Sequence, residues 1–503
     1  MQTQPPINIV WLKRDLRLRD HAPLARAIAD GLPVLLLHCF EPGLMAAPEY
    51  DVRHWRFVYE SLEDMQGRLR ERGQRLFFTQ LEVLEALSLL AGFFDIKNLY
   101  SHEEVGLKIT FDRDKAVKKW CLANGTGYRE FPQNGTLRGR KHRRGWQGQL
   151  EEYFATPPVQ VDLSQLKTVR LPEALEKRFA GQPLPSAITT CQEGFQRGGE
   201  TLAWRYFISF INNRKAQYSR QLSKPEGSRT ACSRLSPYLA FGCISAREVM
   251  QATAIRIAEN GPDWNLNNFK SRLWWRSHYV QKLESDWRVE VQPINPAFLQ
   301  MDLAGEGPLL EAWRAGRTGF PMVDASMRCL HANGWVNFRM RAMLVTFAAF
   351  ALRLDWRPVA THLARLFLDF DPGIHYPQIQ MQYGLTGYNT LRIFNPAVQV
   401  RNHDPGGVFI KKWVPELQNV PAKHLAEPWM MTPMEQAFYS TRIGEDYPAP
   451  IVDYDQAVAR NKAAYWALRQ SPAAKAALPA VWETFCLPAD VEKYREGEEV
   501  CPT

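Results

Sequence analysis

The chain has 503 residues, more than the roughly 250 to 300 at which a single hydrophobic core stops growing, so we expect at least two domains. Its hydrophobic fraction of 45% and charged fraction of 23% are those of ordinary globular proteins, which excludes a mainly disordered or fibrous chain. The net charge of +9 and the pI near 9.1 favour a polyanionic partner such as DNA, because neutralised phosphates release their counterions.

Residues 1–135 alternate between strand and helix patterns. The expected strands are short apolar runs at 7–12, 32–40, 75–79 and 98–101. The expected helices, with apolar residues at helical spacing, lie at 24–28, 54–72 and 83–94. This alternation predicts an α/β domain with a Rossmann-like, doubly wound parallel sheet. Neither GxGxxG nor GxxxxGK[ST] occurs here, so no phosphate-binding loop is indicated.

Residues 136–198 are expected to form a connector. Prolines punctuate this stretch, which opens with a basic cluster formed by Arg138, Arg140, Lys141, Arg143 and Arg144. A solvated loop and a DNA contact are both consistent with such a cluster.

Residues 199–503 are expected to form an all-α domain. The pattern from Gly199 to about Asp371 is helix after helix, and a helical texture continues beyond Glu427. We find no internal repeat.

The eight cysteines are scattered, and no two are spaced as CxxC, the usual nucleus of a zinc or iron–sulfur site. We therefore expect reduced thiols and no metal. No apolar run approaches the ~18 residues of a membrane span, and 1–8 lacks the pattern of a secretory signal. We expect a soluble, cytoplasmic protein without a membrane segment, and a monomer.

Several motifs follow one another in a specific order. The chain reads CSRLSPYL at Cys232–Leu239, GRTGFPMVDA at Gly316–Ala325, GWVNFRMR at Gly334–Arg341 and RIFNP at Arg392–Pro396. Together with WLKRDLRLRDH at Trp11–His21, this series resembles the DNA photolyase/cryptochrome family, in its bacterial branch without an iron–sulfur cluster. The resemblance implies an N-terminal antenna domain and a C-terminal, all-helical FAD-binding domain.

The resemblance implies where FAD binds. Ser233 and Ser236 would offer hydroxyl groups and amides to the diphosphate, although an ordinary helix cap uses the same residue types. Arg341 with Asp369 would hold positive charge near a ring that becomes anionic on reduction, and a purely structural ion pair is the alternative. The residues implied to contact FAD are Tyr218, Cys232, Ser233, Arg234, Leu235, Ser236, Arg272, Arg339, Arg341, Asp369 and Asp371.

The family repairs UV-damaged DNA by light-driven electron transfer from reduced FAD to a pyrimidine lesion extruded from the duplex. By resemblance, Trp275, Phe338 and Gln399 lie on the DNA side, and Trp275 packs against the lesion. His375 aligns near the residue that faces flavin N5, where an imidazole can donate a proton. Trp275 and His375 are therefore the expected catalytic residues, while either is also an ordinary core residue type.

Family members usually reduce their flavin through three tryptophans. Trp313 and Trp356 match the outer and middle members, so these are the expected electron-transfer residues. Ile379 occupies the flavin-proximal position when residues are counted from Asp371. Electrons must then take another aromatic path, or reduction must occur differently.

Lesion class is left open. The Glu, Asn and Met that contact cyclobutane dimers in the family are replaced here by Arg272, Phe338 and Ala342, and the two histidines of enzymes that repair (6-4) photoproducts are also missing. Loss of all three dimer contacts slightly favours (6-4) photoproducts, with cyclobutane dimers as the alternative.

The antenna pigment and the repair role both have alternatives. Glu103–Leu107 lacks, after Val105, the Asn-Glu pair that looks characteristic of folate-binding relatives, so 8-hydroxy-5-deazaflavin is favoured over folate, with an empty or flavin-filled pocket also open. Cryptochrome signalling is the main alternative to repair, but a long regulatory tail is not evident. A light-independent flavin oxidoreductase lacks support, because no nicotinamide fingerprint is present.

Overall fold

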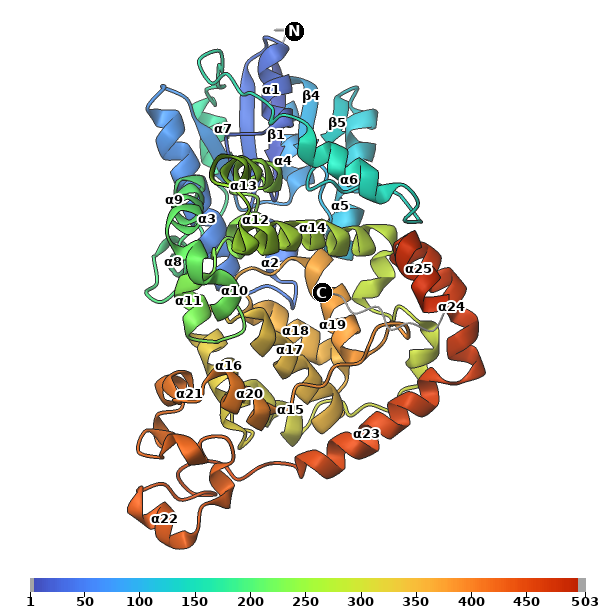
Figure 1. Cartoon of the computed structure of the whole chain (residues 1–503). Coiled ribbons are helices and arrows are strands. Elements are labelled where there is room, and N and C mark those ends of the chain that lie inside the picture. The colour runs from blue at the N-terminus through green and yellow to red at the C-terminus, as the bar shows by residue number, and fades with distance from the viewer. Residues whose placement is uncertain (1–3, 496–503) are drawn as a thin grey trace.

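The computed structural model describes residues 4–495 and has an α/β part followed by a helical part (Figure 1). The α/β part contains one sheet of five parallel strands in the order β3-β2-β1-β4-β5. The strands are β1 (Pro6–Leu12), β2 (Val34–Cys39), β3 (Leu76–Thr79), β4 (Asp95–His102) and β5 (Gly127–Phe131). Because β1 is central and the chain proceeds outward in both directions, the predicted doubly wound sheet is confirmed.

The strand assignment follows from burial. Every residue of β2, and every residue of β1 after Pro6, is buried, as expected for parallel strands with helices on both faces. The helices of this part are α1 (Ala22–Ala29), α2 (Pro42–Met45), α3 (Val52–Arg70), α4 (Val83–Ala91) and α5 (Lys108–Ala123).

The segment that follows the sheet has structure of its own. It contains α6 (Trp146–Ala155), α7 (Glu173–Phe179) and α8 (Ser186–Thr189). Between them it returns to the sheet, where the amide of Val34 donates to the carbonyl of Lys167 at 2.7 Å.

The helical part is an assembly of short and medium helices around one long helix, α14 (Trp264–Ser285), which lies along the boundary with the α/β part (Figure 1). From residue 199 to 495 no strand occurs, so the predicted all-α character is confirmed for the described chain. The other helices are α9 (Glu200–Asn212), α10 (Tyr218–Gln221), α11 (Gly227–Ala231), α12 (Ser236–Ala240), α13 (Ala246–Asn260), α15 (Pro308–Ala315), α16 (Pro321–Asn333), α17 (Phe338–Thr346), α18 (Trp356–Leu366), α19 (Pro372–Tyr383), α20 (Pro396–His403), α21 (Val408–Trp413), α22 (Pro433–Phe438), α23 (Tyr454–Arg469), α24 (Pro472–Phe485) and α25 (Pro488–Arg495).

Helices α14 and α19 pack against each other and frame the site described below. Their approach is close at Gly373, where an added Cβ would lie 2.9 Å from the Cα of Val280. A larger residue there would push the two helices apart.

The loop after β1 joins the two parts of the molecule. The Leu16 amide donates to the Phe241 carbonyl at 3.2 Å, Arg14 Nε donates to the Ala240 carbonyl at 2.9 Å, and Arg17 Nη1 donates to the Gly242 carbonyl at 3.0 Å. The N-terminal motif therefore holds the segment that follows α12. None of the helices between residues 4 and 495 has both the length and the apolar character needed to cross a bilayer.

Candidate functional site

A cavity of about 600 Å³ opens among α10, α12, α14, α17 and α19. Its volume lies within the roughly 300 to 1,000 Å³ typical of cofactor sites. Every residue implied to contact FAD lines it, as do Trp275 and Phe338. The members of this set are Tyr218, Cys232, Ser233, Arg234, Leu235, Ser236, Arg272, Trp275, Phe338, Arg339, Arg341, Asp369 and Asp371.

The cavity wall carries hydroxyl groups and a buried guanidinium. Helix α12 begins at Ser236 without a side-chain capping bond, so the serines of this motif are not used as an ordinary helix cap. Arg234 has a left-handed backbone (φ 61°), and its guanidinium lies 4.0 Å from the ring centre of Trp335 and donates to Gln196 Oε1 at 2.6 Å. Burial lowers the pKa of Arg234 to about 10. Because α12 has five residues, its dipole is short, and the side chains and loop amides are the main donors.

Two ion pairs line one end of the cavity, and the Ser236 side chain hydrogen-bonds to Asp369 of one pair. Arg341 makes a bidentate pair with Asp369, with both N–O distances 2.9 Å. Burial by itself raises the pKa of Asp369, but the charge and hydrogen bonds of Arg341 outweigh it and lower the pKa. Arg276 Nη2 donates to Asp371 Oδ2 at 2.8 Å, and burial lowers the pKa of Arg276. The Nη1 atom of Arg276 is buried without a hydrogen-bond partner and borders the same cavity.

His375 lies behind this end, in a smaller adjoining cavity of about 130 Å³. Its Nε2 lies 2.9 Å from the Ala360 carbonyl, which can only accept, so Nε2 carries the proton. Burial lowers the pKa of His375 to about 4, so the ring is neutral near pH 7. The single ring proton is thus donated to the Ala360 carbonyl in α18, and Nδ1 is left as an acceptor.

Besides His375, three of the residues expected from the sequence lie outside the main cavity. Gln399 is 6% exposed, and its Nε2 donates to the Asn395 carbonyl at 3.4 Å, so a DNA contact would require it to move. Trp313 and Trp356 are 0% and 1% exposed, in α15 and α18. Ile379 lines the smaller cavity beside His375.

The cavity also contains residues that the sequence analysis did not assign to the site. Gln378, Met381 and Gln382 point into it from α19, and Tyr279 from α14. The signal that identifies them is helical spacing, because Asp371, Ile374, Gln378, Met381 and Gln382 recur every three or four residues and share one face.

The basic cluster after the sheet does not form one surface. Arg143 is buried, with its guanidinium 4.8 Å from the ring centre of Trp146, and burial lowers its pKa to about 9. Arg138 lies 3.6 Å from both Glu130 and Glu284. These two arginines therefore have structural roles.

Within residues 4–495, one group of side chains has the spacing of a metal site, formed by Asp15, His21 and His102. The amide of Leu24 donates to His21 Nδ1, and His21 Nε2 lies 3.1 Å from Asp15 Oδ2. His102 Nδ1 lies 2.8 Å from the same oxygen. Asp15 Oδ2 therefore lies between the two histidine rings.

The carboxyl ends of the strands, where α/β sheets bind ligands, are filled by side chains. The ring of Trp11 lies between Lys13 Nζ at 4.6 Å and the Arg113 guanidinium at 4.7 Å. Arg113 pairs with Glu41 at 2.7 Å and with Glu104 at 2.5 Å. A second chromophore at this edge would have to displace Trp11 and break these buried pairs.

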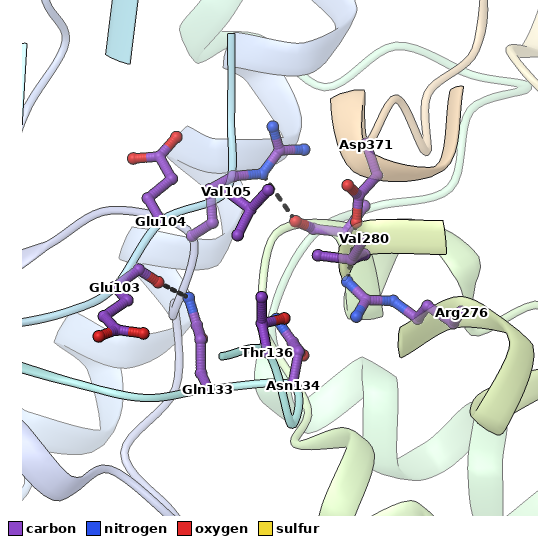
Figure 2. Close-up of a pocket in the computed structure, with 11 residues that line it drawn as sticks. Glu103, Glu104, Val105, Gln133, Asn134, Thr136, Arg276, Val280 and Asp371 are labelled. Atoms are coloured by element: carbon purple, nitrogen blue, oxygen red, sulfur yellow. Dashed lines mark hydrogen bonds and ion pairs between the residues drawn. The ribbon is translucent and has the colours of Figure 1, made fainter. Parts of the chain in front are cut away.

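A small polar pocket separates the two parts of the molecule (Figure 2). Glu103 and Gln133 face Arg276 and Asp371 across it, and the Gln133 amide donates to the Glu103 carbonyl at 2.9 Å. Burial raises the pKa of Glu103 to about 7. The pocket volume of about 20 Å³ has room for a single water, so a folate does not fit there.

The main cavity, in contrast, fits a flavin dinucleotide. It offers hydroxyl groups, Arg234 and the Arg341–Asp369 pair, together with aromatic and apolar walls. When bound, FAD would supply one-electron chemistry driven by light, while these residues would hold and orient it.

Comparisons with known proteins agree with this site. The family model described as the FAD binding domain of DNA photolyase matches residues 269–467, and the model described as DNA photolyase matches 8–152. The deoxyribodipyrimidine photo-lyase of Alkalihalophilus pseudofirmus is 27% identical over 91% of this chain and 97% of its own length. The cryptochrome DASH of Synechocystis sp. is 26% identical over 92% of this chain and 98% of its own length.

The fold also resembles that of a solved cryptochrome structure. The crystal structure of a cryptochrome from Synechocystis sp. aligns with a TM-score of 0.83, at 24% identity, over 92% of this chain and all of that one, a likeness that concerns the fold alone. With both family models matched in chain order and a cofactor-sized cavity lined largely by the FAD-binding range, the chain belongs to the DNA photolyase/cryptochrome family.

Proposed function

We propose that this protein repairs UV-damaged pyrimidines in DNA by light-driven electron transfer from reduced FAD. The observation that carries the proposal is that the implied flavin residues share one cavity with Trp275 and with Phe338, which is 53% exposed at the mouth. An extruded lesion entering the mouth would meet Trp275, on which a base can stack. The cations Arg272 and Arg339 line the same cavity and suit the DNA backbone.

The lesion class is the finer part of the proposal. The sequence slightly favours (6-4) photoproducts, and that preference used His375 as a proton donor. Neutral His375 donates its proton to Ala360, so its support for an acid role is weak. The relative from Alkalihalophilus is named deoxyribodipyrimidine photo-lyase, which favours cyclobutane dimers. We therefore propose pyrimidine lesions as the substrate class, and the assay below separates the two.

The assay uses chemically reduced, FAD-loaded protein and two oligonucleotides, one with a cyclobutane dimer and one with a (6-4) photoproduct. Under blue light, one of them is expected to return to intact pyrimidines by chromatography, with no conversion in darkness. Trp275→Ala should slow repair, because lost base stacking costs about 1 to 3 kcal/mol. Trp264→Ala is the matched control, since Trp264 is in the same helix and 77% exposed.

Blue-light signalling is the second candidate, favoured by the likeness to cryptochrome DASH. The same assay separates it from repair. A protein that holds FAD and responds to light but restores neither lesion belongs to the signalling class.

We also propose that FAD is the pigment this chain holds tightly. If the 8-hydroxy-5-deazaflavin favoured by the sequence binds at the strand ends, where α/β sheets hold ligands, it would compete with Trp11 and Arg113 for that space.

A further inference from the structure

The electron-transfer route suggested by the family motifs lacks an inner aromatic ring and a solvent-exposed outer ring in this chain. At the inner end, Ile379 stands where a ring is required. At the outer end, Trp313 is 0% exposed, and its buried indole nitrogen has no hydrogen-bond partner. The Trp313 ring therefore has no direct contact with solvent, into which an outer tryptophan would release its indole proton.

A second set of indole rings reaches the cavity from another direction. Trp275 lines the cavity, and its ring centre lies 5.3 Å from that of Trp274 in an edge-on contact at 84°. Trp274 is partly exposed, and so connects the cavity wall with the surface of α14. Trp146 of α6 lies behind it, 5.4 Å from Trp274.

We propose that Trp275 and Trp274 form the route by which electrons enter the cavity to reduce the flavin. The inference rests on the proposal that this cavity holds FAD. Van der Waals contact between the two indoles favours rapid electron exchange, and the partial exposure of Trp274 gives the outer ring access to proton acceptors and reductants in solution.

Neighbouring charges define where this route ends. The Arg143 guanidinium lies 4.8 Å from the ring centre of Trp146, and positive charge at that distance opposes removal of an electron from the ring. Trp146 is also 0% exposed. His278 stacks on Trp274 at 5.7 Å, but burial lowers its pKa well below the ordinary value, so this neighbour is neutral. The electron vacancy is therefore more stable on Trp274 than on Trp146.

Charge also disfavours the other aromatic donors in the cavity wall. Trp335 lies beneath the Arg234 guanidinium at 4.0 Å. Tyr279 has Lys282 Nζ 5.1 Å from its ring centre, and burial raises its pKa, which makes loss of its proton harder.

A thiol in solution supplies the electron and the proton that restore Trp274. Trp275 gives one electron to the light-excited oxidised flavin, and Trp274 gives one electron to oxidised Trp275. Trp274 then releases its indole proton to water. A thiol in solution returns one electron and one proton to Trp274, and two oxidised thiols join as a disulfide.

The test is photoreduction of FAD-loaded Trp274→Phe, with the flavin content measured first. In the presence of dithiothreitol, loss of the oxidised-flavin absorbance under blue light should slow about tenfold relative to wild type, equal to about 1.4 kcal/mol in the barrier. Transient absorption should show an oxidised tryptophan in wild type and lose that signal in Trp274→Phe. Trp275→Phe should give the same two results.

Trp356→Phe and Trp264→Phe are the controls, and both should photoreduce at the wild-type rate. A wild-type protein that does not photoreduce, a Trp274→Phe variant as fast as wild type, or loss of photoreduction in Trp356→Phe would each overturn the route. Dithionite bypasses the route, so dithionite-reduced Trp274→Phe should repair as wild type does. Failure of repair in reduced wild type would instead refute the proposed function.

Discussion

Buried histidines make the stability of this protein sensitive to mild acid. Burial lowers the pKa values of His38, His54 and His375 to about 4, because the charged ring is disfavoured away from water. The unfolded chain has histidine pKa values of about 6.5. As the pH falls below about 6.5 the unfolded chain takes up protons that the folded chain does not, so stability is full above that pH and is lost as the pH falls toward 4.

His375→Asn tests this at a single residue. Between pH 7.5 and 5.5, wild type should lose about 1.3 kcal/mol of unfolding free energy for each such histidine. In His375→Asn that loss should be smaller by the same amount, even if the variant is less stable at pH 7.5. Urea denaturation at the two pH values measures it. His142→Asn is the control for the substitution itself, because the His142 side chain is exposed.

At this scale, motifs predicted more than physical patterns did. The residues implied to contact FAD do share one cavity, since they occur in motifs of fixed spacing. The partner of His375 could not be predicted, because Ala360 is in another helix and offers only its carbonyl. Gln399 is buried for a similar reason, since the packing of α20 cannot be inferred from sequence spacing.

At the scale of elements, the GRTGFPMVDA motif owes its specificity to a buried carboxylate. Asp324 Oδ1 accepts from the Thr318 amide at 2.8 Å and from its hydroxyl at 2.7 Å, while Oδ2 accepts from the Gly319 amide at 3.1 Å. Tyr447 donates to the same Oδ2 at 2.6 Å from a distant segment. The motif therefore fixes the turn before α16 and attaches it to the C-terminal chain.

Tyr447→Phe should destabilise the protein by about 2 kcal/mol, because it removes one donor from a buried carboxylate without changing the ring. FAD content should be unchanged, since none of these residues lines the cavity. Thermal unfolding and the flavin-to-protein absorbance ratio measure the two effects. A variant that keeps its stability but loses FAD would show that the motif acts on the cofactor.

Gly242 is required where the two parts of the molecule meet. Its φ is +66°, and an added Cβ would lie 2.1 Å from the Arg14 carbonyl oxygen. Gly242→Ala should therefore cost about 3 kcal/mol, from the left-handed backbone and the overlap together. Gly31→Ala is the matched control, because Gly31 has a similar φ of +75° and open space around it, and it should cost about 1 kcal/mol. Equal losses in the two variants would contradict the close contact with Arg14.

Elements with a strong apolar pattern were predicted, and those without one were not. The runs at 7–12 and 32–40 correspond to β1 and β2, which are buried on both faces. Strand β5 was not assigned, because it is an edge strand whose residues are exposed or half-buried and so lack an apolar run. The preceding helix α5 was not assigned either, because it has few buried residues and so a weak apolar face.

At the scale of the whole molecule, the order of an α/β part and a helical part could be predicted, but their contact could not. That contact depends on Arg14, whose guanidinium reaches the Phe370 carbonyl between Asp369 and Asp371. No pattern singles out Arg14 beyond its place in the N-terminal motif. The α/β part therefore supports the loop that carries both cavity carboxylates.

The same packing bears on the antenna. Trp11 and the ion pairs of Arg113 fill the strand ends, and the pocket between the two parts has room for one water. A pigment at the strand ends would have to break buried pairs, at about 3 to 5 kcal/mol for each uncompensated charge. Protein purified from a host that makes 8-hydroxy-5-deazaflavin should therefore release FAD alone when heated, as judged by chromatography. Release of one deazaflavin per chain would mean that the side chains at the strand ends rearrange to admit it. Trp11→Ala, which removes the indole ring from that place, should then increase deazaflavin binding.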